Sequence, residues 1–168
     1  QGRARRLGWR PVFGQLLFMT LVLPILRRRS GARLDAISKA CDLRLDHLPE
    51  HRLTSIPSVN APETREILRQ IAPDVVILSG TRIVGSGTLD AVGAPVLNVH
   101  AGITPLFRGV HGGYWALWTG QSQDFGATVH VVDKGVDTGN VLEHVRPTPT
   151  PDDNFVTYPL LQLGTALP

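Results

Sequence analysis

The sequence has a single cysteine, Cys41, among its 168 residues. One thiol cannot form an internal disulfide, so a disulfide-stapled secreted scaffold is excluded and a reducing, cytoplasmic compartment is favoured. A lone cysteine at helical spacing is typical of a small core residue rather than a nucleophile. The sequence also lacks internal repeats, low-complexity tracts and a Gly-x-Gly-x-x-Gly phosphate loop.

Acidic residues are missing from the first 33 positions, which hold eight arginines. The other 135 residues carry a net charge of −5, so the overall +3 belongs to a basic N-terminal arm. Only this arm could indicate a nucleic-acid partner. The arm has no groove-like interleaving of aromatic and basic residues, and we do not predict such a partner. With 42% hydrophobic and 18% charged residues, the chain is neither a disordered tail nor a multi-span membrane protein.

The arm contains an uncharged apolar run of fifteen residues, Val12–Leu26. The run is too short to span a bilayer at about 1.5 Å per residue. Arg27–Arg29 stands where a signal peptide would have its cleavage site, so we do not expect export. Two interpretations stay open: a largely buried helix with solvated arginine ends, which we favour, or a basic interfacial helix that lies on a membrane or docks a protein partner.

The rest of the chain alternates between helical and strand patterns. Val75–Leu78 and Pro95–Val99 are continuous apolar runs, which are typical of strands covered on both faces. The pattern predicts an α/β fold with a doubly wound, mostly parallel sheet, in which ligands bind beyond the carboxyl ends of strands. The other expected elements are helices at 34–41, 60–71, 88–92, 112–119 and 152–163 and strands at 126–132 and 140–145.

Polar residues gather after the second apolar run. Asn98 and His100 are two apart in a strand and therefore point to the same face, where an amide and an imidazole could stabilise an oxyanion. A loop rich in Gly, Thr and Pro follows. The helix after it carries Trp115 and Trp118, which are large enough to form a pocket wall.

A second polar cluster lies in Asp133-Lys-Gly-Val-Asp137-Thr-Gly, directly after the strand at 126–132. A loop carboxylate at this place could orient an imidazole or a water molecule. Asp-x-Gly and Asp-Thr-Gly are also common turn formers, so the cluster alone does not indicate a catalytic site.

The two clusters in this order resemble the 10-formyltetrahydrofolate-dependent formyltransferase family, which includes methionyl-tRNA, glycinamide ribonucleotide and amino-sugar formyltransferases. The matching motifs are Asn98-x-His100, Arg108-Gly109 and Thr128-Val-His-x-Val-Asp-x-Gly-x-Asp137-Thr-Gly. The resemblance implies a Rossmann-like fold and a catalytic set of Asn98, His100 and Asp137, with no metal. The amine of a small acceptor, such as an amino sugar or an amino acid derivative, would attack the formyl carbon, and Asn98 and His100 would stabilise the oxyanion. Asp137 would orient His100 or a water molecule and help to move the proton.

The resemblance also implies where the two substrates bind. The co-substrate 10-formyltetrahydrofolate would lie against two segments, and the acceptor against the loop after the second strand. The folate residues are Arg82, Ile83, Val84, Asp133, Gly135 and Asp137, and the acceptor residues are Ile103, Thr104, Pro105, Arg108 and Gly109.

The resemblance further divides the chain into a helical arm, 1–33, and a formyltransferase-like catalytic domain, 34–168. The first strand of the family and its glycine-containing turn have no counterpart, and the chain begins with glutamine. We therefore expect a fragment or processed form, or a domain that lacks this strand. Two other functions stay open: a hydrolase of formyltetrahydrofolate and a non-catalytic binding module. A homodimer is also left open.

Overall fold

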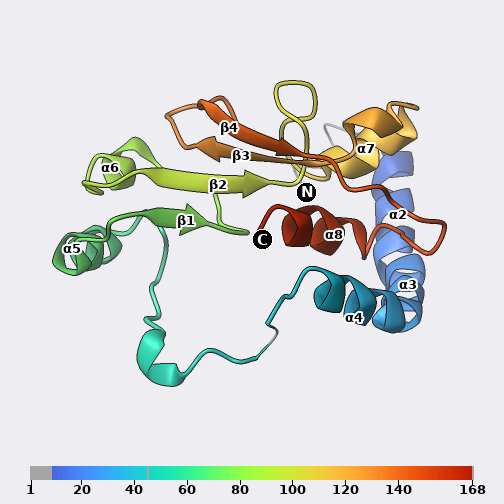
Figure 1. Ribbon diagram of the computed structural model, residues 1–168, viewed down its shortest axis with the longest axis horizontal. Coiled ribbons are helices and arrows are strands. Elements are labelled where there is room, and N and C mark those ends of the chain that lie inside the picture. The colour runs from blue at the N-terminus through green and yellow to red at the C-terminus, as the bar shows by residue number, and fades with distance from the viewer. Residues whose placement is uncertain (1–8, 45, 168) are drawn as a thin grey trace.

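The computed structural model describes residues 9–44 and 46–167, so Arg3, Arg5 and Arg6 of the arm lie outside the described residues. Its centre is a four-stranded sheet in the order β1 (Val76–Leu78), β2 (Val96–His100), β3 (Ala127–Val131) and β4 (Val141–Val145) (Figure 1). The α/β fold is confirmed. The sheet itself is mixed rather than mostly parallel, because β1 and β2 are parallel whereas β2–β3 and β3–β4 are antiparallel.

The antiparallel pairing of β3 with β4 follows from the length of their connection. The loop 132–140 joins β3 to β4, and it is shorter than the dozen or more residues that a parallel crossover needs. β3 and β4 therefore form a hairpin, with an irregular register at Val129 and His130. The hairpin loop, which carries Asp133 and Asp137, is held beside the end of β3.

Helices lie at both ends of the sheet (Figure 1). The helices expected at 60–71 and 112–119 form with small shifts at their ends, and the one expected at 152–163 begins later, at Tyr158. The Thr157 hydroxyl accepts the Asn154 N–H, which ties the residues before α8 into a turn. The elements are α4 (Gly31–Ala40), η2 (Glu50–Arg52), α5 (Pro62–Ile71), α6 (Ser86–Leu89), α7 (Gly112–Trp118), η3 (Ser122–Asp124) and α8 (Tyr158–Thr165).

The core lies where α4 and α8 meet the segment before β3. Ile37, Phe125 and Leu161 are its buried apolar residues, and Cys41 packs against them as expected for a small core side chain. Two ion-paired hydrogen bonds of 2.8 and 2.7 Å join the Arg33 guanidinium to the Asp153 carboxylate. These contacts fix α4 and the turn before α8 to each other.

The apolar run near the N-terminus forms one continuous helical stretch from α2 (Trp9–Leu17) through the π-helical η1 (Phe18–Val22) to α3 (Leu23–Arg29). The favoured interpretation, a largely buried helix, is wrong for the described chain, since none of these residues is buried. The run is apolar on all sides, and the domain covers only part of it. The run of fifteen residues was expected to be too short to span a bilayer, but the helix extends beyond it at both ends. With 21 residues, Trp9–Arg29 is the one described helix that is long and apolar enough to cross a membrane.

Candidate active site

A cavity of about 470 Å³ opens beyond the carboxyl ends of β1 and β2, where an α/β sheet is expected to bind its ligand. Nine of the residues singled out from the sequence line this cavity. They are Arg82, Ile83, Val84, Asn98, His100, Gly109, Asp133, Gly135 and Asp137.

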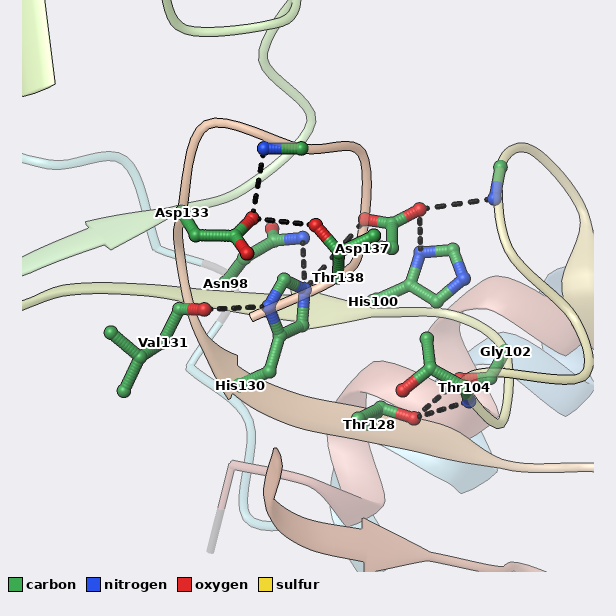
Figure 2. A network of polar contacts seen from close by, with 12 residues as sticks. Asn98, His100, Gly102, Thr104, Thr128, His130, Val131, Asp133, Asp137 and Thr138 are labelled. Carbon is green, nitrogen blue, oxygen red and sulfur yellow. Dashed lines mark hydrogen bonds and ion pairs between the residues drawn. The ribbon is translucent and has the colours of Figure 1, made fainter. Parts of the chain in front are cut away.

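Asn98 reaches the cavity from the middle of β2, and His130 lies directly opposite it on β3. The Asn98 Nδ2 amide is 3.2 Å from His130 Nε2 (Figure 2). The other ring nitrogen, Nδ1, is 3.0 Å from the Val131 carbonyl oxygen. A carbonyl only accepts, so Nδ1 carries a proton and Nε2 of the neutral ring accepts the amide N–H. The pair fixes the direction of the Asn98 amide.

His100 is the last residue of β2 and is almost fully buried. Its Nε2 donates to the Phe107 carbonyl oxygen at 2.8 Å, and its Nδ1 lies 3.5 Å from Asp137 Oδ2. Nε2 carries a proton, because a carbonyl oxygen only accepts, and Nδ1 faces the carboxylate. The 3.5 Å separation is longer than a hydrogen bond and leaves Nδ1 available to a ligand.

Asp137 lies between the two imidazoles. Its Oδ2 faces His100, while its Oδ1 is 3.6 Å from His130 Nε2. The Gly109 N–H donates to Oδ2 at 3.0 Å, which connects the hairpin loop to the loop after β2. Asp137 has a φ of +50°, a left-handed conformation that aspartate tolerates better than most residues. The turn brings the carboxylate over the end of β2 (Figure 2).

Asp133 organises the same hairpin loop rather than facing the imidazoles. Its Oδ1 accepts the Thr138 hydroxyl at 2.7 Å and the Gly135 N–H at 2.9 Å (Figure 2). These hydrogen bonds, first that from Thr138 and then that from Gly135, lower the pKa of Asp133. A Cβ on Gly135 would overlap Thr138 Oγ1, so the loop requires glycine there.

The segment 79–85 forms the other wall of the cavity, after β1. Asn60 holds it from outside: the Asn60 amide donates to the Ile83 carbonyl at 2.9 Å and accepts the Gly85 N–H at 2.7 Å. Asn60 lies just before the N-cap of the following helix, which is Ala61. Arg82 and Val84 line the cavity on either side of this anchor.

Four residues expected to contact the acceptor do not line the cavity. Ile103 and Thr104 are buried, and the Thr104 N–H donates to the Thr128 hydroxyl at 3.0 Å. The loop turns inward here because the Thr128 hydroxyl also donates to the Gly102 carbonyl. Pro105 and Arg108 are exposed and are not among the lining residues. Only Gly109 of the expected loop lies at the cavity.

The sequence interpretation missed His130 and an aromatic wall. His130 stands in the strand expected at 126–132, but its register against Asn98 comes from the folded sheet. The expected Trp115 and Trp118 are exposed and do not line this cavity, whereas Tyr114, one position earlier, does. The wall consists of His111, Tyr114, Phe155 and Tyr158, whose rings contact one another in part. Burial raises the pKa of Tyr158.

Comparison with known proteins agrees with this geometry. Two curated relatives are methionyl-tRNA formyltransferases: that of Syntrophus aciditrophicus is 31% identical over 59% of this chain and 32% of its own length. The methionyl-tRNA formyltransferase of Myxococcus xanthus is 35% identical over 61% of this chain and 33% of its own length. The chain thus spans about a third of the length of these relatives.

Solved structures show the same fold. A phosphoribosylglycinamide formyltransferase from Streptococcus pneumoniae has a TM-score of 0.53 and 33% identity over 62% of this chain and 59% of that one. A sugar N-formyltransferase from Shewanella has a TM-score of 0.56, and the match covers 86% of this chain and 60% of that one. Its identity is only 17%, so this similarity shows the fold alone. The family model described as formyl transferase matches residues 44–158, which include all the residues that line the cavity except Pro159, Gln162 and Leu163. By its sequence match and its fold, the chain belongs to the formyl transferase family.

Proposed function

We propose that the cavity transfers a formyl group from 10-formyltetrahydrofolate to the amine of a small acceptor. The observation that supports this most is the position of the Asp137 carboxylate, within 3.6 Å of both His100 and His130, the second of which contacts Asn98. Such a cluster offers hydrogen-bond donors for an oxyanion and a base for a proton in one place. Membership of the formyl transferase family supports the same reaction.

In the proposed reaction, a C–N bond forms between the acceptor nitrogen and the formyl carbon, and the C–N bond to the folate breaks. One proton leaves the acceptor nitrogen and one reaches the folate nitrogen, so atoms and charge balance. The Asn98 amide and the protonated Nδ1 of His100 donate to the oxygen on which negative charge develops. Asp137 stabilises the imidazolium and passes the proton, directly or through a water molecule.

The cavity fits the proposed co-substrate. Its volume of about 470 Å³ lies within the range of roughly 300–1,000 Å³ that is usual for small-molecule sites. The segment of Arg82 and Val84 and the hairpin loop of Asp133 and Gly135 form two facing walls. Backbone groups on these walls would hold the pterin, as expected from the resemblance.

We propose a small amine as the acceptor and the cytoplasm as the place of the reaction. The relatives and structural neighbours are formyltransferases of methionyl-tRNA, phosphoribosylglycinamide and sugars, so an amine is the chemistry that these names share. The aromatic wall of His111, Tyr114 and Phe155 is the part of the cavity lining proposed to face the acceptor.

The test is a screen of candidate amines with 10-formyltetrahydrofolate, in which tetrahydrofolate release and the mass of the acceptor are both measured. Formyl transfer predicts that tetrahydrofolate and formylated amine appear in equal amounts. Free formate released without any amine would instead show a hydrolase. Binding of a folate analogue without turnover on any amine would show a binding module, and either result would overturn the proposal.

A further inference from the structure

The helical stretch Trp9–Arg29 lies outside the part of the chain that matches the formyl transferase family, and no step of the proposed reaction uses it. One side of it contacts the domain. Phe18 packs edge to face on Phe155, with ring centroids 5.2 Å apart, and Phe18, Leu23 and Leu26 are half-buried. The other side faces solvent.

The exposed part of the stretch carries an apolar stripe of five residues at every fourth position. Residues four apart are neighbours on a helix surface and each lies about 40° further round, so the stripe winds around the helix along the stretch. Each of the five side chains is at least 45% exposed, which is unusual for residues of this size and hydrophobicity. They are Trp9, Phe13, Leu17, Leu21 and Ile25.

Positive charge lies at both ends of the stripe and negative charge is absent from it. Arg10 is at the first turn, and Arg27, Arg28 and Arg29 form the last turn. Three arginines in the last turn also complement the negative end of the helix dipole. In the sequence no acidic residue precedes Asp35. A surface that covers this stripe must therefore be apolar along its length and anionic at both ends.

We propose that the stretch Trp9–Arg29 binds the surface of a bilayer that contains anionic lipids. In this arrangement the stripe lies among the acyl chains just below the headgroups, and the arginines at both ends bind lipid phosphates. The helix lies in the plane of the membrane rather than across it, since Phe18 holds one face against the domain. The Ser30–Asn154 side-chain contact of 3.0 Å and the Arg33–Asp153 pair fix its end.

The arrangement also places the lipid surface near the cavity. Phe155, which contacts Phe18, is part of the aromatic wall of that cavity. The proposal nevertheless stands without the formyl-transfer reaction, because it depends only on the stripe, the arginines and the contacts that hold the helix against the domain.

Flotation with vesicles tests the proposal, since vesicles float whereas aggregated protein sinks. The probes are vesicles of phosphatidylcholine alone and of phosphatidylcholine mixed equally with phosphatidylglycerol. We expect the wild-type protein to float with the mixed vesicles, and to float less as salt is added. The variant with Arg27→Gln, Arg28→Gln and Arg29→Gln should bind the mixed vesicles about 100-fold more weakly, because each arginine near an anionic surface contributes to binding.

The stripe is tested with Phe13→Asp and Leu21→Asp together, which should also weaken vesicle binding by at least about 100-fold. Both side chains are exposed, so the fold should be kept, and circular dichroism checks this. The matched control is Leu48→Asp, an exposed leucine away from the helix, which should float like the wild type.

Three outcomes would overturn the proposal. The wild-type protein could fail to float with mixed vesicles, or the stripe variant could float as well as the wild type. The stripe could also mediate self-association: sedimentation velocity would then show a dimer that the stripe variant loses, without vesicle binding.

Discussion

Asn98 and His130 are register partners on antiparallel strands, and their side chains meet in a 3.2 Å hydrogen bond at the floor of the cavity. The Val131 carbonyl fixes the ring on its other side. His130 thereby holds the Asn98 amide in one orientation, and the proposed oxyanion donor is directed by a neighbouring strand. His130 acts in this account as a positioning residue.

The variant His130→Leu should lower formyl transfer by about 10- to 100-fold, because a misplaced donor loses much of its effect on the reacting group. Steady-state kinetics with the best acceptor from the screen measure this. His130→Gln keeps an acceptor at the position of Nε2 and should recover much of the rate. Equal losses in both variants would indicate that His130 is needed only for packing.

The variant Asp137→Asn removes the negative charge between the two imidazoles but keeps an oxygen that can accept the Gly109 N–H. We expect the turnover rate to fall by about 100- to 10,000-fold, the usual contribution of a general acid or base, with little change in the binding of a folate analogue. Asp90→Asn, at an exposed residue near Lys134, is the control and should keep the wild-type rate. An Asp137→Asn enzyme with wild-type turnover would remove the carboxylate from the mechanism.

Much of the sheet could be predicted from local pattern. The apolar runs located β1 and β2, and the period-two rule placed Asn98 and His100 on one face. The partner of Asn98 could not be predicted in this way, since the register of β3 against β2 depends on pairing between distant segments. The antiparallel pairing of β3 with β4 could have been predicted, because the loop between the strands expected at 126–132 and 140–145 is too short for a parallel crossover.

The loop after β2 and the N-terminal helix show two further limits. Ile103 and Thr104 were expected at the acceptor, but hydrogen bonds with Thr128, which lies 24 or more residues away, turn the loop into the core. The apolar run at 12–26 correctly predicted a helix. The prediction that this helix is largely buried was wrong. Hydrophobicity indicates that a surface needs a partner, but it does not show where that partner lies.

Gly112 is required by the close approach of α7 to the loop after β2. A Cβ on Gly112 would lie 2.6 Å from Gly102 Cα and 2.8 Å from the Ala101 carbonyl oxygen. Gly112→Ala should therefore lower the free energy of unfolding by about 1–3 kcal/mol, as other overpacked substitutions do. Urea denaturation measures the change. Gly93→Ala, which has no heavy atom within 4 Å of the new Cβ, is the control, and equal stability of the two variants would contradict the close approach.

The Arg33–Asp153 pair predicts a loss of stability in acid. Burial raises the pKa of Asp153, but hydrogen bonds from Arg33, Thr150 and Thr157 outweigh it and lower the pKa to about 2. A lowered pKa means that the carboxylate stabilises the fold above its unfolded pKa of about 3.9, and that this contribution is lost as the pH falls toward about 2. The contribution is about 2 kcal/mol.

Urea denaturation of the wild type and of Asp153→Asn at a series of pH values measures this contribution. The difference in the free energy of unfolding should shrink by about 2 kcal/mol between about pH 6 and about pH 2. Asp152→Asn, at the neighbouring exposed carboxylate, should show no such trend. A difference between wild type and Asp153→Asn that is constant with pH would contradict the assignment.

The most direct test of the proposed reaction is the single-turnover rate of formyl transfer in His100→Ala, compared with the wild type and with His51→Ala, an exposed histidine away from the cavity. Binding of a folate analogue is measured in parallel to show that the cavity is intact. Loss of one oxyanion donor should slow transfer by about 100- to 1,000-fold while analogue binding is kept. A His100→Ala protein that transfers the formyl group at the wild-type rate would contradict the assignment of this cavity as the active site.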